Sequence, residues 1–153
     1  MKKEVKLYNV IFPIFMLYVF PTYAWLFIIL LNFIIDSLVV ILAAKSRKLD
    51  WKNVWKKSIL NVVWIGFLCD FVGGALTWVL AATVFEGLNL FTWPDLIFLT
   101  LPGIALAGVL IYFVNKKFSF RKAKLEPEQV HHICLMLAIF TAPYTMMIPY
   151  YLH

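Results

Sequence analysis

The stretch YAWLFIILLNFIIDSLVVILAAKSRK, residues 23–48, decides the fold class of this chain. Its first 22 residues contain a single charged side chain, Asp36, and the basic residues begin only at Lys45. A helix rises 1.5 Å per residue, so about 20 residues cross the ~30 Å hydrocarbon core of a bilayer. Residues 23–44 therefore predict a transmembrane helix that carries a carboxyl group near its middle.

Apolar sequence recurs along the whole chain, and 63% of the 153 residues are hydrophobic while only 14% are charged. A soluble protein of this size could not cover its surface with so few charges, whereas a bilayer removes that need. The apolar blocks lie at residues 7–44, 58–85, 95–115 and 133–152. Each of the last three suits one crossing, and Pro143 and Pro149 predict a kink or an unwound end in the last.

The first block is too long for one crossing, and Pro21 interrupts it. Proline lacks a backbone donor and clashes with the preceding turn, so a helix ends there. Residues 7–20, which also contain Pro13, predict a short or re-entrant helix that forms a hairpin with residues 23–44. We expect an all-α bundle of five segments in a single transmembrane domain, residues 1–153.

The basic residues indicate the orientation. Every Lys and Arg falls in residues 2–6, 45–57 or 116–124, whereas the segments around Pro21 and at 86–95 contain none. The positive-inside rule then places the N-terminus and both basic loops in the cytoplasm and the C-terminus outside. The net charge of +6 is thereby explained without nucleic acid, and we expect the basic face to meet anionic lipid headgroups.

Two tryptophans mark the inner interface. Trp51 and Trp55 are four residues apart, and the lysines between and after them point elsewhere on a helix. This pattern predicts a short helix lying on the inner membrane surface before the span at 58–85.

Two acids lie inside apolar segments. Asp36 is eight residues from Ala44 and Asp70 is twelve from Ser58, which places them roughly 12 and 18 Å deep. A charge at such depth costs at least about 2.5–3.5 kcal/mol. Because every basic residue is cytoplasmic or interfacial, each aspartate must be protonated, bind a cation, face water or be neutralised by hydrogen bonds.

Polar neighbours favour a binding site. Asn32 shares a helical face with Asp36, and Thr77 follows Asp70 on the next helix. We therefore predict an ion- or substrate-binding set of Asp36, Asp70, Asn32 and Thr77. Two alternatives stay open: each acid is a neutral bridge between helices, or a partner protein supplies a counter-charge.

Small residues surround Asp70 and recur in the segment 103–108. Such residues let helices approach closely in membranes. The positions predicted for helix packing are Gly66, Gly73, Gly74, Gly103, Ala107 and Gly108.

The sequence offers little for catalysis. No HExxH, phosphate loop, CxxC or nucleophile–base set is present. The pair His131 and His132 lacks a third ligand at useful spacing, and Cys69 and Cys134 are isolated in apolar segments. We expect no enzyme, metal or cofactor; a membrane aspartyl hydrolase would need two facing acids and a water path.

Residues 112–121, YFVNKKFSFR, resemble the NR-x-(W/F)-T-F motif that ends a helix in GtrA-like proteins, with Lys116 in place of the usual arginine. The resemblance implies a role in moving polyprenyl-linked sugars across membranes, in a family with four rather than five segments. The rest of the chain resembles small bacterial membrane proteins, which implies a multi-pass protein of the bacterial cytoplasmic membrane.

Three kinds of function suit these features. The first is a small transporter or channel that uses Asp36 and Asp70 for a proton, a cation or a cationic substrate. Five short segments enclose little volume, so self-association or a partner subunit would help to build a path. The second is a lipid-handling protein whose basic surface meets lipid headgroups or a lipid-linked phosphate. The third is a non-catalytic accessory subunit of a larger membrane complex.

Overall fold

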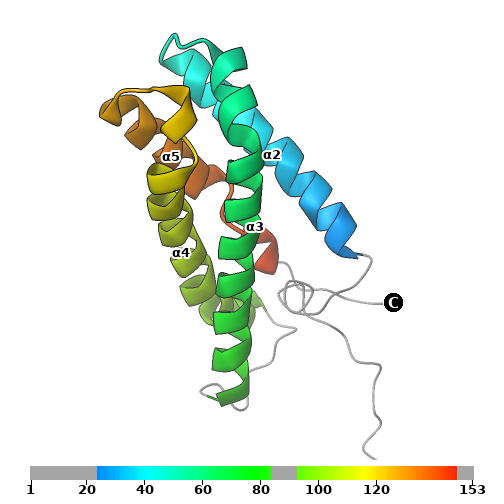
Figure 1. The fold of residues 1–153 in the computed structure, drawn as a ribbon. Coiled ribbons are helices and arrows are strands. Elements are labelled where there is room, and N and C mark those ends of the chain that lie inside the picture. The colour runs from blue at the N-terminus through cyan, green and yellow to red at the C-terminus, as the bar shows by residue number, and fades with distance from the viewer. Residues whose placement is uncertain (1–23, 84–92, 148–153) are drawn as a thin grey trace, which may run out of the picture.

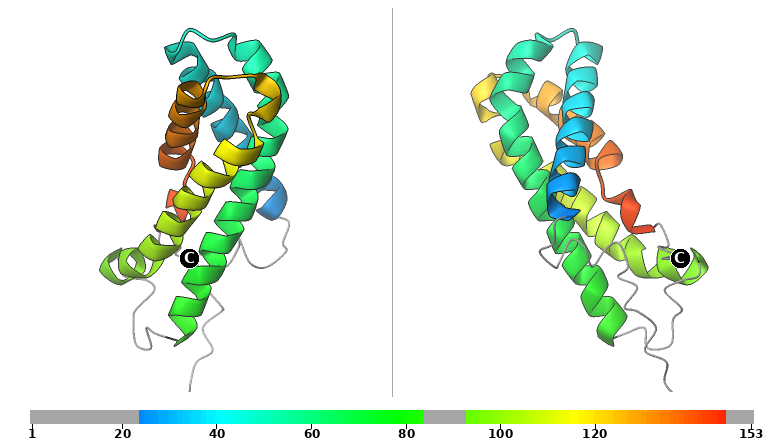
Figure 2. Two further views of the ribbon diagram at one scale, coloured as in Figure 1. Left: turned by 60° about the vertical axis from the view of Figure 1, so that its left-hand side comes forward. Right: turned by 90° about the vertical axis from the view of Figure 1, so that its right-hand side faces the viewer.

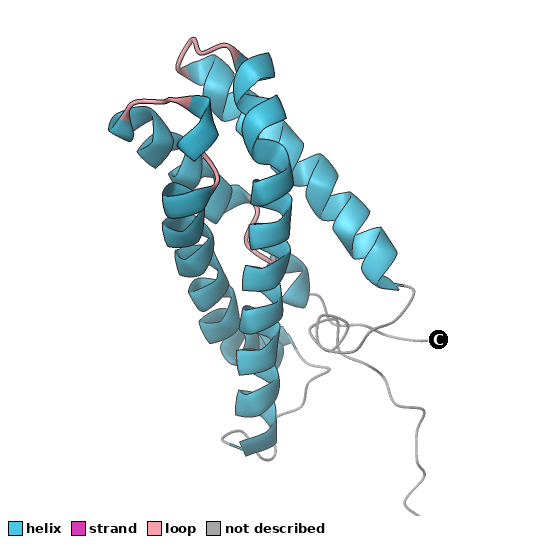
Figure 3. Ribbon diagram, viewed as in Figure 1, coloured by secondary structure: helices cyan, strands magenta, loops and turns pink. Residues whose placement is uncertain are grey.

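The computed structural model describes residues 24–83 and 93–147, and this part of the chain is helical without strands (Figure 3). The long helices are α2 (Ala24–Ser46), α3 (Trp51–Thr83), α4 (Trp93–Phe118) and α5 (Pro127–Phe140). Two short 3-10 helices, η1 (Arg121–Ala123) and η2 (Tyr144–Met147), follow α4 and α5.

The helices form a ring. α3 packs against α2 on one side and α4 on the other, and α5 packs against both α2 and α4 (Figure 1, Figure 2). Short loops join α2 to α3 and α4 to α5 at the same end of the bundle (Figure 1). Sequential neighbours are therefore antiparallel.

Within the described ranges, four helical stretches are long and apolar enough to cross a membrane: Leu26–Ser46, Trp51–Thr83, Pro94–Phe118 and Pro127–Met147. Large apolar side chains cover the outside, among them Phe98 of α4 at 74% exposure and Leu60 of α3 at 69%. Such a surface suits lipid rather than water. The prediction of an all-α fold is therefore confirmed, with helices long and apolar enough to span a membrane. The predicted helix at 7–20, with which residues 23–44 would form a hairpin, lies outside the described residues.

The prediction of a separate surface helix around Trp51 and Trp55 is wrong. α3 begins at Trp51 and runs without interruption into the span, because no proline or glycine separates the two regions. Both indoles are half-buried against the core near the basic end, and Lys45 Nζ lies 5.3 Å from the Trp51 ring centroid. The two tryptophans thus anchor the first turns of α3.

The basic residues gather at one end of the bundle. In the described residues, every Lys and Arg lies between Lys45 and Lys57 or between Lys116 and Lys124. Both stretches flank the loops at the end where α2 meets α3 and α4 meets α5 (Figure 1). The middle of the described bundle therefore contains no Lys or Arg.

The last span is broken. α5 has 14 residues, which reach only about 21 Å, less than the ~30 Å core. The Thr141 amide still donates to the Leu137 carbonyl at 2.8 Å, but Pro143 has no amide hydrogen and the helix gives way to η2. The predicted unwound end is confirmed at Thr141–Pro143, while Pro149 lies outside the described residues.

Candidate functional site

The two buried aspartates lie near each other at the interface between α2 and α3. Asp36 lies in the middle of α2 and Asp70 in the middle of α3, with 2% and 1% of their surfaces exposed. α2 and α3 are antiparallel neighbours, and their register sets Asp36 against Gly66 and Asp70 against Asn32. The two acids therefore lie about one helical turn apart along the interface.

Contacts across the interface between α2 and α3 position the two carboxyl groups. Asn32 Nδ2 of α2 donates to Asp70 Oδ2 at 3.1 Å across the helix interface. One turn away, a Cβ on Gly66 of α3 would lie 3.3 Å from Asp36 Oδ2. Gly66 thus supplies the space for the Asp36 carboxyl, and Asn32 bonds the Asp70 carboxyl.

Two carboxyl oxygens of the pair are unpartnered. Asp36 Oδ2 and Asp70 Oδ1 are buried and have no hydrogen-bond partner among the described residues. The middle of the described bundle also contains no Lys or Arg. Buried carboxyl groups in this condition are costly when ionised, and a bound proton or another cation would lower that cost.

Thr141, at the break of α5, completes the site from a third helix. Its side chain lies near the Asp36 carboxyl, and its hydroxyl donates to the Leu137 carbonyl at 2.8 Å. A threonine hydroxyl has one proton to donate. While that proton stays on the Leu137 carbonyl, the hydroxyl has no proton left to donate to Asp36.

Thr141 was missed in the sequence because it is 105 positions from Asp36, in a stretch without obvious polar spacing. The available signal was a hydroxyl residue two positions before Pro143. Proline breaks often expose polar groups inside a membrane.

Thr77, predicted for the binding set, lies elsewhere in the bundle. Its hydroxyl donates to the Gly73 carbonyl at 3.0 Å, and its Oγ1 lies against Gly103 of α4. Thr77 therefore belongs to the interface between α3 and α4, whereas Asn32 bonds Asp70 across the interface between α2 and α3.

Most of the predicted packing residues lie in helix contacts. A Cβ on Gly73 would lie 2.5 Å from the Gly103 carbonyl oxygen and 3.0 Å from the Ala107 Cβ. Gly108 lies against α5, where its Cβ would be 3.4 Å from the Ala138 carbonyl oxygen. Gly74 is buried on α3 beside Gly73.

The histidine pair ties α5 to its neighbours at the basic end. Tyr112 Oη of α4 lies 2.7 Å from His131 Nδ1, and Ser46 Oγ of α2 lies 3.0 Å from His132 Nε2. Across the described ranges, no three His, Cys, Asp or Glu side chains gather closely enough to hold a metal ion.

Asn115, within the segment that resembles GtrA-like proteins, is fully buried. Its Nδ2 donates to the Ile111 carbonyl at 2.9 Å, and its Oδ1 accepts from Ser119 Oγ at 2.5 Å. Asn115 thus links the last turn of α4 to the chain that leaves it.

We expect Asn115→Leu to lower the free energy of unfolding by about 1–3 kcal/mol, because the buried Ser119 hydroxyl loses its acceptor. Thermal unfolding in mild detergent measures the effect. Asn61→Leu, at an exposed position of α3, serves as the matched control with little change. Equal stability of the two variants would show that the Asn115 bonds contribute nothing.

Comparison with known proteins finds no matching family, no similar protein among those with curated descriptions and no similar solved structure.

Proposed function

We propose that this chain is a small multi-spanning transporter or channel that moves protons or other cations by way of Asp36 and Asp70. The observation that carries the proposal is the neighbouring pair of buried carboxyl groups, each with one unpartnered oxygen. Such groups are expensive to keep in a membrane, and intramembrane carboxylates commonly mark ion pathways.

The broken helix strengthens the case for a positively charged ligand. The C-terminal end of α5 carries the negative end of the helix dipole and carbonyl groups without helical partners. Thr141 brings this end to Asp36. Ends of interrupted helices near the membrane midplane coordinate cations in secondary transporters. Two carboxyl groups and a helix C-terminus all favour positive charge.

The proposal also covers how the chain is oriented in the membrane. With the basic end of the bundle in the cytoplasm of a bacterial cell, α5 starts at the inner face and its break lies within the membrane. Residues 7–20 would form the hairpin with α2 that gives five segments and a cytoplasmic N-terminus. A homo-oligomer or a partner subunit would enclose the path beside the carboxyl pair.

A lipid-handling role is the second candidate. It is favoured by an apolar groove between α2 and α3 together with the basic end, which suits anionic headgroups. The two candidates differ in what the carboxyl groups do, since moving an anionic lipid has no use for a buried pair of acids.

The test is flux into proteoliposomes. The purified full chain should dissipate an imposed gradient of protons, Na⁺ or K⁺, read with entrapped ion-sensitive dyes. Asp36→Asn and Asp70→Asn should reduce this flux to the level of protein-free liposomes, because an amide neither carries a proton nor balances a cation.

Asp50→Asn is the matched control. Asp50 is an exposed acid in the loop between α2 and α3, and asparagine can replace it at the start of α3. Its flux should equal that of the wild type. Full flux in both Asp36→Asn and Asp70→Asn, with the proteins folded, would exclude the proposed role of the pair.

A further inference from the structure

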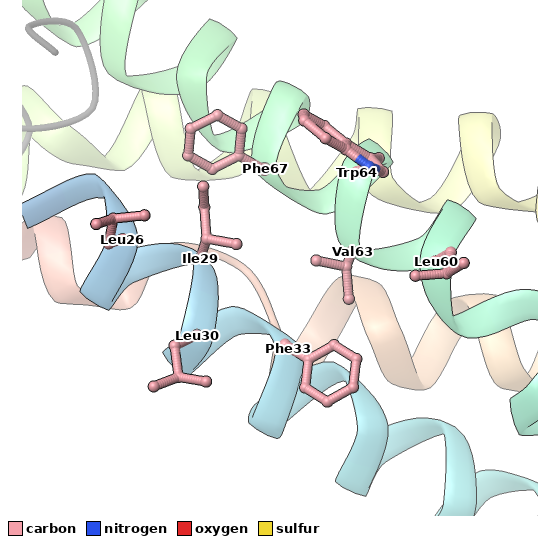
Figure 4. A pocket seen from close by; sticks show the side chains of 8 residues that line it. All are labelled: Leu26, Ile29, Leu30, Phe33, Leu60, Val63, Trp64 and Phe67. Carbon is pink, nitrogen blue, oxygen red and sulfur yellow. The ribbon is translucent and has the colours of Figure 1, made fainter.

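The outer side of the interface between α2 and α3 contains a groove of about 400 Å³. α2 diverges from α3 with distance from the loop that joins them (Figure 1), and apolar side chains of both helices line the space between. The lining residues are Leu26, Ile29, Leu30, Phe33, Leu60, Val63, Trp64 and Phe67 (Figure 4).

We propose that this groove admits a lipophilic organic cation from the bilayer and presents its charged centre to Asp36 and Asp70. The inference rests on the proposed cation-transport function and names its substrate class. It goes beyond that function because an inorganic ion would gain nothing from binding in an apolar groove.

The size and lining of the groove suit the apolar body of such a ligand. Its volume falls within the roughly 300–1,000 Å³ range of small-molecule pockets. Val63 and Phe67 form a buried floor, whereas Leu26 and Trp64 are 73% and 63% exposed at its rim. The exposed rim lies on the bilayer side of the bundle, so an amphiphile would enter from the lipid.

Aromatic rings favour a cation over a neutral molecule. Phe33, Trp64 and Phe67 all line the groove, and Ile29 points across it toward Phe67 (Figure 4). The faces of aromatic rings attract organic cations, most strongly where water is excluded.

The groove floor adjoins the carboxyl pair. Phe33 lies three residues before Asp36 on α2, and Phe67 lies three residues before Asp70 on α3, so each acid is a helix-surface neighbour of a groove residue. Both acids are buried behind the lining and do not line the groove themselves. A cation in the groove would therefore lie within about one helical turn of two acids that have no basic partner in the described bundle.

The experiment measures binding of tetraphenylphosphonium to the purified full chain in lipid nanodiscs, by equilibrium dialysis. Triphenylphosphine oxide, which is similar in shape but neutral, is the ligand control. We expect saturable binding of the cation and no saturable binding of the neutral compound. Asp70→Asn should weaken binding of the cation by about tenfold or more, as the loss of a charge contact predicts.

Val63→Trp should weaken binding to a similar extent, because the larger ring fills the groove and leaves both carboxyl groups in place. Phe98→Trp, on the exposed face of α4, is the matched control and should bind as the wild type does. Flux of inorganic cations in Val63→Trp shows that this variant is folded.

Absence of saturable binding in the wild type would overturn the inference. So would equal binding of the neutral compound, which would mark the groove as a site for lipid chains, or unchanged affinity in Asp70→Asn. The inference can fail while the proposed function holds. In that case, the flux of inorganic cations would still depend on Asp36 and Asp70, although the organic cation would not bind.

Discussion

Gly103→Val should prevent α3 and α4 from packing as they do in the wild type. A Cβ on Gly103 would overlap Thr77 Oγ1 and lie 2.5 Å from the Gly73 carbonyl oxygen. The second of these contacts is with backbone, which cannot turn aside as a flexible side chain can. We expect a cost above the roughly 1–3 kcal/mol of ordinary overpacking, with loss of the folded state in thermal unfolding and size-exclusion measurements in detergent.

Gly108→Ala is the matched control on the same helix. Its Cβ would lie 3.4 Å from the Ala138 carbonyl oxygen and 4.0 Å from the Ala142 Cβ, which are ordinary contact distances. This variant should remain folded, with a change of less than about 1 kcal/mol. If Gly103→Val proved as stable as Gly108→Ala, the close crossing of α3 and α4 would be contradicted.

Asp36→Leu should make the protein more stable while abolishing flux. The substitution removes a buried carboxyl group with an unpartnered oxygen, and leucine has a similar branched shape. Thr141 keeps its bond to the Leu137 carbonyl, so no new buried donor is orphaned. Replacing uncompensated buried charge by apolar groups is often stabilising, here by about 1–3 kcal/mol. Thermal unfolding and proteoliposome flux, measured on the same preparation, test both parts.

Asn32→Leu should have the opposite effect on stability. It deprives Asp70 Oδ2 of the 3.1 Å bond from Asn32 Nδ2, which leaves the Asp70 carboxyl without that donor and costs about 1–3 kcal/mol. The two variants separate a functional site from a structural bridge. A bridging acid would make Asp36→Leu less stable than the wild type, and that result would contradict the functional interpretation.

The positions of the spans were largely predictable. The predicted bounds 23–44 and 95–115 differ by only a few residues from α2 and α4, because the preference of each apolar side chain for lipid is independent of its neighbours. The start of α3 at Trp51 was not predicted. Interfacial tryptophans and lysines look alike in a surface helix and in the first turns of a span, and only packing against the core distinguishes them.

The positions of Asp36 and Asp70 within long apolar helices, the lack of basic residues beside them and the break near Pro143 were determined by the sequence alone. Each is a local property, set by distance along a helix or by the missing amide of proline. The tertiary structure decided which of these groups meet. It brought Asp36, Asp70, Asn32 and Thr141 together and set Thr77 against α4. The rotation of each helix about its axis depends on where small residues such as Gly66 and Gly73 permit close approach, and that choice involves two helices at once.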